Sequence, residues 1–432
     1  MTTQISESLP LVPSPREWFA SDGTFTLHLG TRVIAEDRRL LEDARTFAQD
    51  VGALIGQHLP VEVAESPRTG DLLIGLVDTA PQHAEGYEVA IGESVRITSR
   101  TLLGVKRATQ TVAQLIAFHP SGHLPHGTIR DWPWVPERGI MLDVGRRYYA
   151  PEYIEDLIRT AAWYKLNVVH LHLTEWNAFR LDSPRFPGLA ADEAYTRDDI
   201  DRFEAIARRY GVTILPEIDL PSHATPITTY WPETVWPCQP MNAERGHNFT
   251  VDVTNPRTRE IVKDLLDEFV PWFSGPRFHI GADEYPYQST QEQCQELVRY
   301  AEANGFANTS DVMVDFIDYM AAIVREHGKT AQAWGWWDAA GSPSRGPDAR
   351  IVVEAYGDDI FAEGAAGARH MLDRGYQVVH ADGNQLYVTP GLDLLPDTER
   401  LYAHWPVPND PNHPNLLGYL VSRWADERED EP

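Results

Sequence analysis

The sequence predicts an α/β protein in which a small α/β domain precedes a (β/α)8 barrel of the TIM type. Its 432 residues are more than one compact core of ordinary size holds. From residue 137 onward, strand-like runs recur, and helical stretches lie between several of them. Residues 1–132 contain short strands and helices without this rhythm. We therefore expect a domain boundary between residues 132 and 133.

The elements of the small domain are predicted from three segments. Residues 71–77 (DLLIGLV) form an apolar run typical of a buried strand. Residues 87–97 (YEVAIGESVRI) alternate in polarity on both sides of Gly92 and Glu93, which favours a β-hairpin with its turn there. Residues 104–118 carry apolar side chains at helical spacing.

The elements of the barrel are predicted from eight apolar runs and the stretches between them. The runs begin at Gly139, Asn167, Val212, Arg277, Thr330, Arg350, Tyr376 and Asn415. The amphipathic, helix-like stretches cover residues 151–165, 197–210, 256–273 and 310–327. Pro151 and Pro256 suit the first turn of a helix. No such stretch follows the eighth run, so the usual last helix is expected to be missing, through truncation or a different closure of the barrel.

The composition excludes several classes of partner. A formal net charge of -27 repels phosphate backbones and anionic membranes, so a neutral substrate is expected. No apolar run approaches the roughly 18 residues of a membrane helix. The first residues lack the basic and apolar regions of a secretory signal, so a cytoplasmic location is expected. The oligomeric state is left open.

The two cysteines give little information. Cys238 and Cys294 lie far apart in the sequence, and neither has the spacing of a metal ligand. A pair of cysteines does not by itself establish a disulfide.

Ionisable and aromatic residues gather where the predicted barrel strands end, the position that carries the chemistry of this fold. They include Arg146, Glu175, Glu217, Asp219, His223, His279, Asp283, Glu284, Trp334, Trp336, Tyr356, Trp424 and Asp426. Each alone is more often a rim ion pair or a satisfied buried polar group. Their joint occurrence indicates an active site.

Asp283 and Glu284 directly follow a predicted strand, where the chain turns and both side chains can face one pocket. Two close carboxyl groups push their pKa values apart, which suits the cleavage of glycosidic bonds. Such pairs are also common on surfaces. Asp219 and His223, four residues apart after another strand, either form a pair that holds a third group or cap the loop.

Four blocks of the sequence resemble family 20 glycoside hydrolases, the β-N-acetylhexosaminidases. They are residues 138–146 (RGIMLDVGR), 165–175 (KLNVVHLHLTE), 216–224 (PEIDLPSHA) and 278–284 (FHIGADE). The resemblance spans nearly the whole chain, and its last two blocks are the specific ones. It implies a retaining exo-glycosidase that releases terminal β-linked N-acetylglucosamine or N-acetylgalactosamine from a glycan or glycoconjugate. Catalysis would be substrate-assisted, through an oxazolinium intermediate.

The resemblance also implies roles for individual residues. Glu284 would be the general acid, Asp283 would hold the acetamido N–H, and Tyr387 would bind the acetamido oxygen. The remaining positions would bind or frame the sugar, or support those that do. Arg146 and Asp426 would bind ring hydroxyls, and Trp334 or Trp336, together with Trp424, would form the walls of the sugar pocket. Asp219 and His223 would support Glu284, and His279 would order the loop. Glu175 and Tyr356 stand at positions that match the family's substrate-binding residues. Neither cofactor nor metal is expected.

Three positions depart from the family pattern. Residues 174–180 read TEWNAFR where the family usually has Thr-Asp-Asp-Gln-Gly-Trp-Arg. Tyr356 stands where a tryptophan is common, and Thr389 replaces the acid of a Tyr-Leu-Asp block. The preference for the leaving group and the recognition of the C4 hydroxyl are therefore left open. A substrate with a galacto-configured sugar or a disaccharide unit remains an alternative.

Two other classes of function remain as alternatives. His170 and His172 form an H-x-H pair that, with His223, His279 and Asp283, would suit a metal-dependent hydrolase. A carbohydrate-binding family member without catalysis is the other, because the loop after residue 174 is altered.

Overall fold

The computed structural model describes residues 9–63, 68–119, 122–238, 247–357, 367–392, 394–403 and 413–426. The chain divides into two compact units. The first comprises Met1–Trp134 with the short pieces Ile158–Leu166 and Ala207–Val212, and the second comprises the rest. A small α/β unit and a closed parallel barrel are both present, so the predicted fold class is confirmed. The exact boundary at residue 132 stays a prediction.

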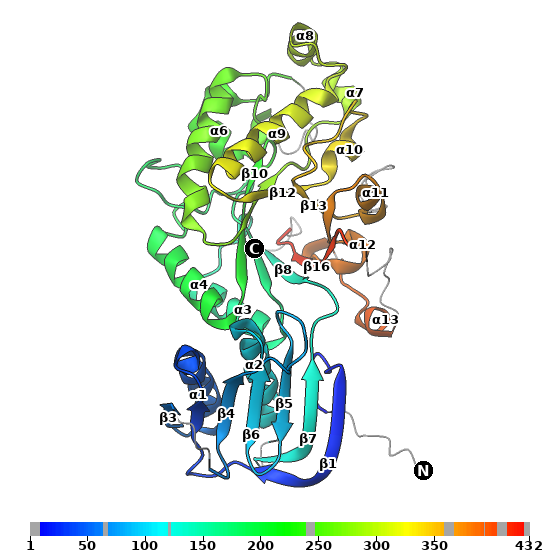
Figure 1. Cartoon of the computed structure of the whole chain (residues 1–432). Helices are drawn as coiled ribbons and strands as arrows, with labels where there is room; N and C mark the ends of the chain where they lie inside the picture. Colours follow the sequence, from blue (N-terminus) through cyan, green and yellow to red (C-terminus); the bar gives the residue numbers. More distant parts are fainter. Residues whose placement is uncertain are drawn as a thin grey trace. The chain divides into compact units, whose positions relative to one another are not determined.

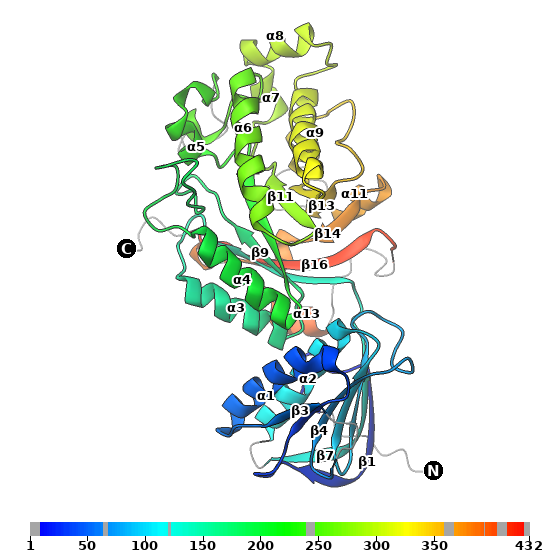
Figure 2. The ribbon, with the colours of Figure 1, turned by 60° about the vertical axis from the view of Figure 1, so that its left-hand side comes forward.

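The first unit is built on a mixed seven-stranded sheet with the order β1-β7-β5-β6-β4-β2-β3 (Figure 1). Its strands are β1 (Glu17–Thr26), β2 (Val33–Ala35), β3 (Val61–Val63), β4 (Leu72–Leu76), β5 (Tyr87–Ile91), β6 (Val95–Ser99) and β7 (His123–Asp131). Helices α1 (Leu41–Ile55) and α2 (Leu102–Phe118) lie against one face of this sheet (Figure 2). The apolar side chains between the helices and the sheet form the core of the unit.

Three predicted elements of this unit are confirmed. The run at residues 71–77 is β4, and residues 104–118 lie within α2. The predicted hairpin is the antiparallel pair β5 and β6, in which Ile91 pairs with Val95. Thr101 caps α2 because its side-chain oxygen accepts from the amide of Gly104.

The second unit is a closed barrel of eight parallel strands. They are β8 (Glu137–Asp143), β9 (Val168–His172), β10 (Thr213–Leu220), β11 (Arg277–Gly281), β12 (Thr330–Trp334), β13 (Val352–Ala355), β14 (Gln377–His380) and β16 (Leu416–Arg423). Each of the eight predicted runs forms one of these strands. Closure comes from β16, which pairs with β14 on one side and β8 on the other. The short β15 (Tyr387–Val388) adds to β16.

Helices connect the barrel strands. They are α3 (Pro151–Trp163), α4 (Arg197–Tyr210), α5 (Thr225–Tyr230), α6 (Pro256–Phe269), α7 (Gln288–Gln291), α8 (Gln295–Ala303), α9 (Ser310–Glu326), α10 (Trp336–Ala340), α11 (Ala368–Asp373), α12 (Gly383–Leu386) and α13 (Thr398–Ala403). The four predicted helices are α3, α4, α6 and α9. The start of α6 illustrates the sequence signals that mark a helix. Asn255 caps this helix by accepting from the amide of Arg257, and Pro256 occupies its first position.

The question of a last barrel helix lies beyond Asp426, outside the described residues. Among the described helices, none combines the length and the apolar character that a membrane span needs.

Cys238 and Cys294, whose pairing the sequence left open, form a disulfide with their Cα atoms 5.5 Å apart. The bond ties the chain after the β10–α5 region to the start of α8. The two catalytic candidates Asp283 and Glu284 lie within the segment that this bond closes.

Candidate active site

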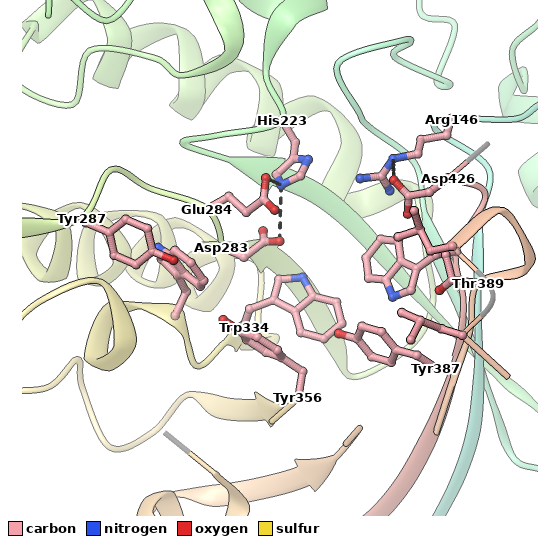
Figure 3. Close-up of a pocket in the computed structure, with 14 residues that line it drawn as sticks. Arg146, His223, Asp283, Glu284, Tyr287, Trp334, Tyr356, Tyr387, Thr389 and Asp426 are labelled. Carbon is pink, nitrogen blue, oxygen red and sulfur yellow. Dashed lines mark ion pairs between the residues drawn. The ribbon is translucent and has the colours of Figure 1, made fainter. Parts of the chain in front are cut away.

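A pocket of about 230 Å³ opens where the barrel strands end (Figure 3). It is lined by Arg146, His223, Asp283, Glu284, Tyr287, Trp334, Trp336, Tyr356, Tyr387, Thr389, Leu392, Leu394, Trp424 and Asp426. Most of these residues were candidates from the sequence, and they come from seven of the barrel strands or the segments that follow them. The structure therefore gathers distant segments into one cavity with both acidic and aromatic walls.

Asp283 and Glu284 face this pocket because the chain turns sharply after β11. Gly281, Ala282 and Glu284 all have positive φ angles, of 73°, 83° and 48°. Only glycine adopts such angles freely, so Ala282 and Glu284 are strained at a cost of about 1–3 kcal/mol each. At this turn, successive side chains no longer point to opposite faces as they do in a regular strand, so two consecutive carboxyl groups can line one cavity.

His223 lies between the two acids and a buried carboxylate. Its Nε2 atom is 3.4 Å from Oδ2 of Asp283 and 3.4 Å from Oε2 of Glu284 (Figure 3). Its Nδ1 atom is 2.6 Å from Oε1 of Glu175. Burial lowers the pKa of His223, but the charges of Glu175 and Asp283 outweigh it and raise this pKa to about 10. The ring is therefore a cation that contacts both acids.

Asp219 and Asp283 are driven to opposite protonation states. Burial, followed by the charges of Asp283 and Glu217, raises the pKa of Asp219 well above its usual value. Burial also acts to raise the pKa of Asp283, but the cationic His223 prevails and lowers it. Asp219 is thus a neutral acid beside a charged Asp283. Such a pair divides the work of donor and acceptor between two carboxyl groups.

Arg146 is held by three carboxylates. Its Nη1 atom is 2.9 Å from Asp143, its Nη2 atom 2.7 Å from Glu175, and its Nε atom 3.2 Å from Asp426. Burial opposes the charge of Arg146, yet these carboxylates raise its pKa above the usual value. A guanidinium fixed in this way presents its forked donors in one orientation.

Aromatic rings form the rest of the pocket wall. The ring of Trp334 lies 5.9 Å from those of Tyr356 and Trp424, and Tyr387 lies 5.8 Å from Trp424, measured between centroids. The sequence left the choice between Trp334 and Trp336 open, and both line the pocket. The buried hydroxyls of Tyr356 and Thr389 have no hydrogen-bond partner among the described residues, so they are available to a ligand.

Three of the candidates that the resemblance assigns to the site lie behind the pocket wall and do not line it: Glu175, Asp219 and His279. All three are fully buried. The Nδ1 atom of His279 is 3.1 Å from the amide of Gly281, a contact that supports the strained turn. These side chains hold those that face the cavity, because full burial leaves them no surface for a substrate.

The sequence did not assign Tyr287, Leu392 and Leu394 to the site, although all three line the pocket. Tyr287 follows Glu284 by three residues, and this proximity was the one available signal. The two leucines belong to a loop after β15, where an apolar residue carries no mark of chemistry.

The histidines of the H-x-H pair do not join His223. Instead, His170 Nε2 and His172 Nδ1 both contact Oε2 of Glu217, at 3.0 and 2.5 Å. Three groups at the strand ends, counted among the described residues, are spaced closely enough to share an ion: His170–Glu217–His279, His172–Glu217–Asp219 and Asp219–His223–Asp283. In the last group, the cationic His223 already supplies the positive charge. The groups overlap at Glu217 and Asp219, but none of them contains all five residues of the ligand set expected for a metal-dependent hydrolase.

Comparisons with known proteins identify the family of the chain. The family model described as the glycosyl hydrolase family 20 catalytic domain matches residues 134–410, and that of family 20 domain 2 matches residues 8–132. The β-hexosaminidases of Porphyromonas gingivalis and Emericella nidulans are 24% and 25% identical over 98% and 77% of this chain. The chain spans 58% of the length of each of these relatives.

A solved structure shows the same fold. The exo-β-N-acetylglucosaminidase of Vibrio harveyi, in complex with N-acetylglucosamine, has a TM-score of 0.83 at 21% identity. The match covers 98% of this chain and 71% of that one. On its fold, its acidic pair and its match to both family models, the chain belongs to glycosyl hydrolase family 20.

Proposed function

We propose that the protein is a retaining exo-β-N-acetylhexosaminidase that works by substrate-assisted catalysis. The observation that carries this proposal is the pairing of a charged Asp283 with Glu284 in one small, aromatic-walled pocket. A cavity of about 230 Å³ suits a single terminal sugar better than the middle of a chain. Relatives named β-hexosaminidase support the same activity.

The reaction proceeds in two steps. First, the carbonyl oxygen of the substrate's 2-acetamido group attacks C1 while Glu284 donates a proton to the leaving oxygen. The C1–O bond to the aglycone breaks, and an oxazolinium ion forms. Glu284, now a carboxylate, then takes a proton from a water molecule that attacks C1 and reopens the ring. Each step inverts C1, so the sugar is released with its configuration retained.

Asp283 stabilises the charge that develops in the first step. Its carboxylate accepts the acetamido N–H, and this bond strengthens as the nitrogen becomes positive. The low pKa of Asp283 keeps it ionised for this task. On the other side of the acetamido group, the hydroxyl of Tyr387 donates to the attacking oxygen and orients it.

The remaining pocket residues bind the sugar ring. Arg146 and Asp426, paired at 3.2 Å, hold ring hydroxyls, and their fixed partners remove the need to reorganise on binding. Trp334 and Trp424 pack against the apolar parts of the sugar. The substrate is then a glycan or glycoconjugate with a terminal N-acetylhexosamine, and cytoplasmic localisation stays a prediction.

The experiment compares nitrophenol release from the 4-nitrophenyl β-glycosides of N-acetylglucosamine, N-acetylgalactosamine and glucose. We expect turnover of one or both N-acetyl substrates and almost none of the glucoside, because the glucoside lacks the internal nucleophile. Comparable turnover of the glucoside contradicts the substrate-assisted mechanism. Binding of an oxazoline-mimicking thiazoline without turnover of any of the three contradicts catalysis itself and favours a binding protein.

A further inference from the structure

Glu217 lies at the centre of the barrel, fully buried on β10, and the mechanism above does not use it. Three nitrogen atoms form hydrogen bonds with its carboxylate. Oε2 contacts His170 Nε2 at 3.0 Å and His172 Nδ1 at 2.5 Å, and Oε1 accepts from Nε1 of Trp334 at 2.7 Å. The Nδ1 atom of His279 lies 3.0 Å from Oε1. A carboxylate has about four acceptor positions, so this one is nearly saturated and has a single orientation.

The charge of Glu217 is maintained inside the barrel. Burial acts to raise the pKa of Glu217, but the charges of His172 and His279 outweigh it and lower this pKa well below its usual range. In turn, burial acts against protonation of His172, and Glu217 restores it by raising the pKa of His172 well above its usual value. The bond from Trp334 to Glu217 is therefore a charge-assisted one, which is stronger than a bond between neutral groups.

Trp334 connects this carboxylate to the pocket. The indole lines the cavity, and its Nε1–H is its one polar group. The rings of His279, Tyr356 and Trp424 pack around the indole, which is buried at 1% exposure. Within this packing, the bond to Glu217 is the polar contact that defines the orientation of the indole.

We propose that Glu217 is a positioning residue that fixes the plane of the Trp334 indole and so sets the shape of the wall that receives the substrate. This inference rests on the proposed function, since it concerns how the same pocket binds the sugar. This role explains why a carboxylate is buried here, since an apolar side chain would serve a purely structural role at least as well.

The test combines Glu217→Gln, Trp334→Phe and the double variant, with Glu354→Gln as the matched control. Glu354 is a fully buried carboxyl group on the neighbouring strand β13, where it pairs with Trp334 in the strand register. Its carboxyl group accepts from Gln332 Nε2 at 2.7 Å, whereas the indole N–H of Trp334 donates to Glu217. Three quantities are measured for each: the inhibition constant of an oxazoline-mimicking thiazoline, KM and kcat on the nitrophenyl substrate, and the thermal midpoint.

Glu217→Gln is expected to raise the thiazoline inhibition constant and KM by roughly ten- to hundredfold, the range for loss of a charge-assisted bond. The amide that this substitution introduces also places an N–H donor next to the N–H donors that surround the carboxylate of Glu217. Glu354→Gln is expected to leave both values unchanged. A Glu217→Gln variant with a lower thermal midpoint but an unchanged inhibition constant overturns the proposal, because its role is then structural only.

The double variant separates positioning from a general loss of packing. Because Glu217 and Trp334 act through one bond, the double variant is expected to bind the thiazoline about as well as the single variant that has the lower affinity for it. Additive losses overturn the proposal. If Glu217→Gln does not fold, Trp334→Phe still decides, since it removes the N–H and keeps a ring; an unchanged inhibition constant there also overturns it. A wild-type protein that neither binds the thiazoline nor turns over any substrate instead refutes the proposed function.

Discussion

The Nδ1 atom of His223 lies 2.6 Å from the Oε1 atom of Glu175, on the opposite side of the ring from the two acids. Both side chains are buried, so little solvent screens this ion pair. Glu175 also contacts Arg146 at 2.7 Å. A single buried carboxylate thus links Arg146 to the histidine that contacts Asp283 and Glu284.

Glu175→Gln is expected to change how stability depends on pH. The pKa of His223 is about 10 in the folded protein against 6.5 for the free side chain. The proton on His223 therefore contributes its full stability below pH 6.5; this contribution declines as the pH rises further and is lost above about pH 10. Without the charge of Glu175, the folded pKa falls and less stability is available to lose. Thermal midpoints measured from pH 6.5 to 10 should decline less steeply in the variant than in the wild type. Equal slopes would contradict the assignment, and His223→Asn serves as the control that cannot titrate.

Glu284→Gln is expected to lower kcat on a natural disaccharide by about 10²- to 10⁴-fold, because the amide cannot donate a proton to the leaving oxygen. The loss should be smaller on the nitrophenyl substrate, whose leaving group needs less protonation. Steady-state rates on both substrates, with thermal midpoints to confirm folding, test this expectation. A near-normal rate on the disaccharide means that another group is the acid.

Asp283→Asn is expected to reduce kcat/KM by about 10²- to 10³-fold, equivalent to roughly 3–4 kcal/mol of lost transition-state stabilisation. The amide keeps the shape of the side chain but presents no charge to the acetamido nitrogen. The variant should hydrolyse N-acetyl substrates poorly at every pH. A loss below about tenfold is too small for a charge-stabilising role.

Asp219→Asn should be tolerated far better than Asp283→Asn. Since burial and neighbouring charges raise the pKa of Asp219, its carboxyl group is neutral, and an amide is a close substitute for a neutral acid. We expect kcat/KM to remain within about tenfold of the wild type. Asp219→Ala is the matched variant, and it should lose more because it leaves a gap behind Asp283. If Asp219→Asn is as damaging as Asp283→Asn, Asp219 acts as an anion.

Replacing Cys238 and Cys294 with serine is expected to lower the free energy of unfolding by about 2–4 kcal/mol, the usual contribution of a disulfide. Denaturant titrations of the oxidised protein, the reduced protein and the double variant measure it. The reduced protein and the variant should coincide. Equal stability of all three would show that the bond does not stabilise the fold. Because such bonds persist mainly in oxidising compartments, a stabilising disulfide would also count against the cytoplasmic location that the sequence predicts.

The sequence predicted the barrel well because six of its eight strands, all except β8 and β16, are buried on both faces over most of their length and so appear as apolar runs. The strand β1, Glu17–Thr26, was not predicted, since most of its side chains are exposed and the polar residues break any alternation. Helix ends were predicted where a cap or proline marks them, as at Pro256, and less well elsewhere.

Candidates for the site were recognisable where chemistry marks a strand end, as for Asp283 and Glu284. Leu392 and Leu394 were not, because only their position in space makes them part of the wall. Glu217 was noted at a strand end without a role, since sequence order cannot show that Trp334, 117 positions later, donates to it. The Cys238–Cys294 bond was open for the same reason: pairing depends on a distance that the sequence does not contain.

The left-handed backbone at Ala282 and Glu284 sets stability against activity. A glycine at residue 284 would adopt the observed φ of 48° without strain, so an inactive protein would be the more stable one there. Laboratory evolution for heat resistance, without a screen for activity, is therefore expected to erode this turn early. Under the proposed mechanism, the acid at residue 284 is kept for catalysis at a cost in backbone strain.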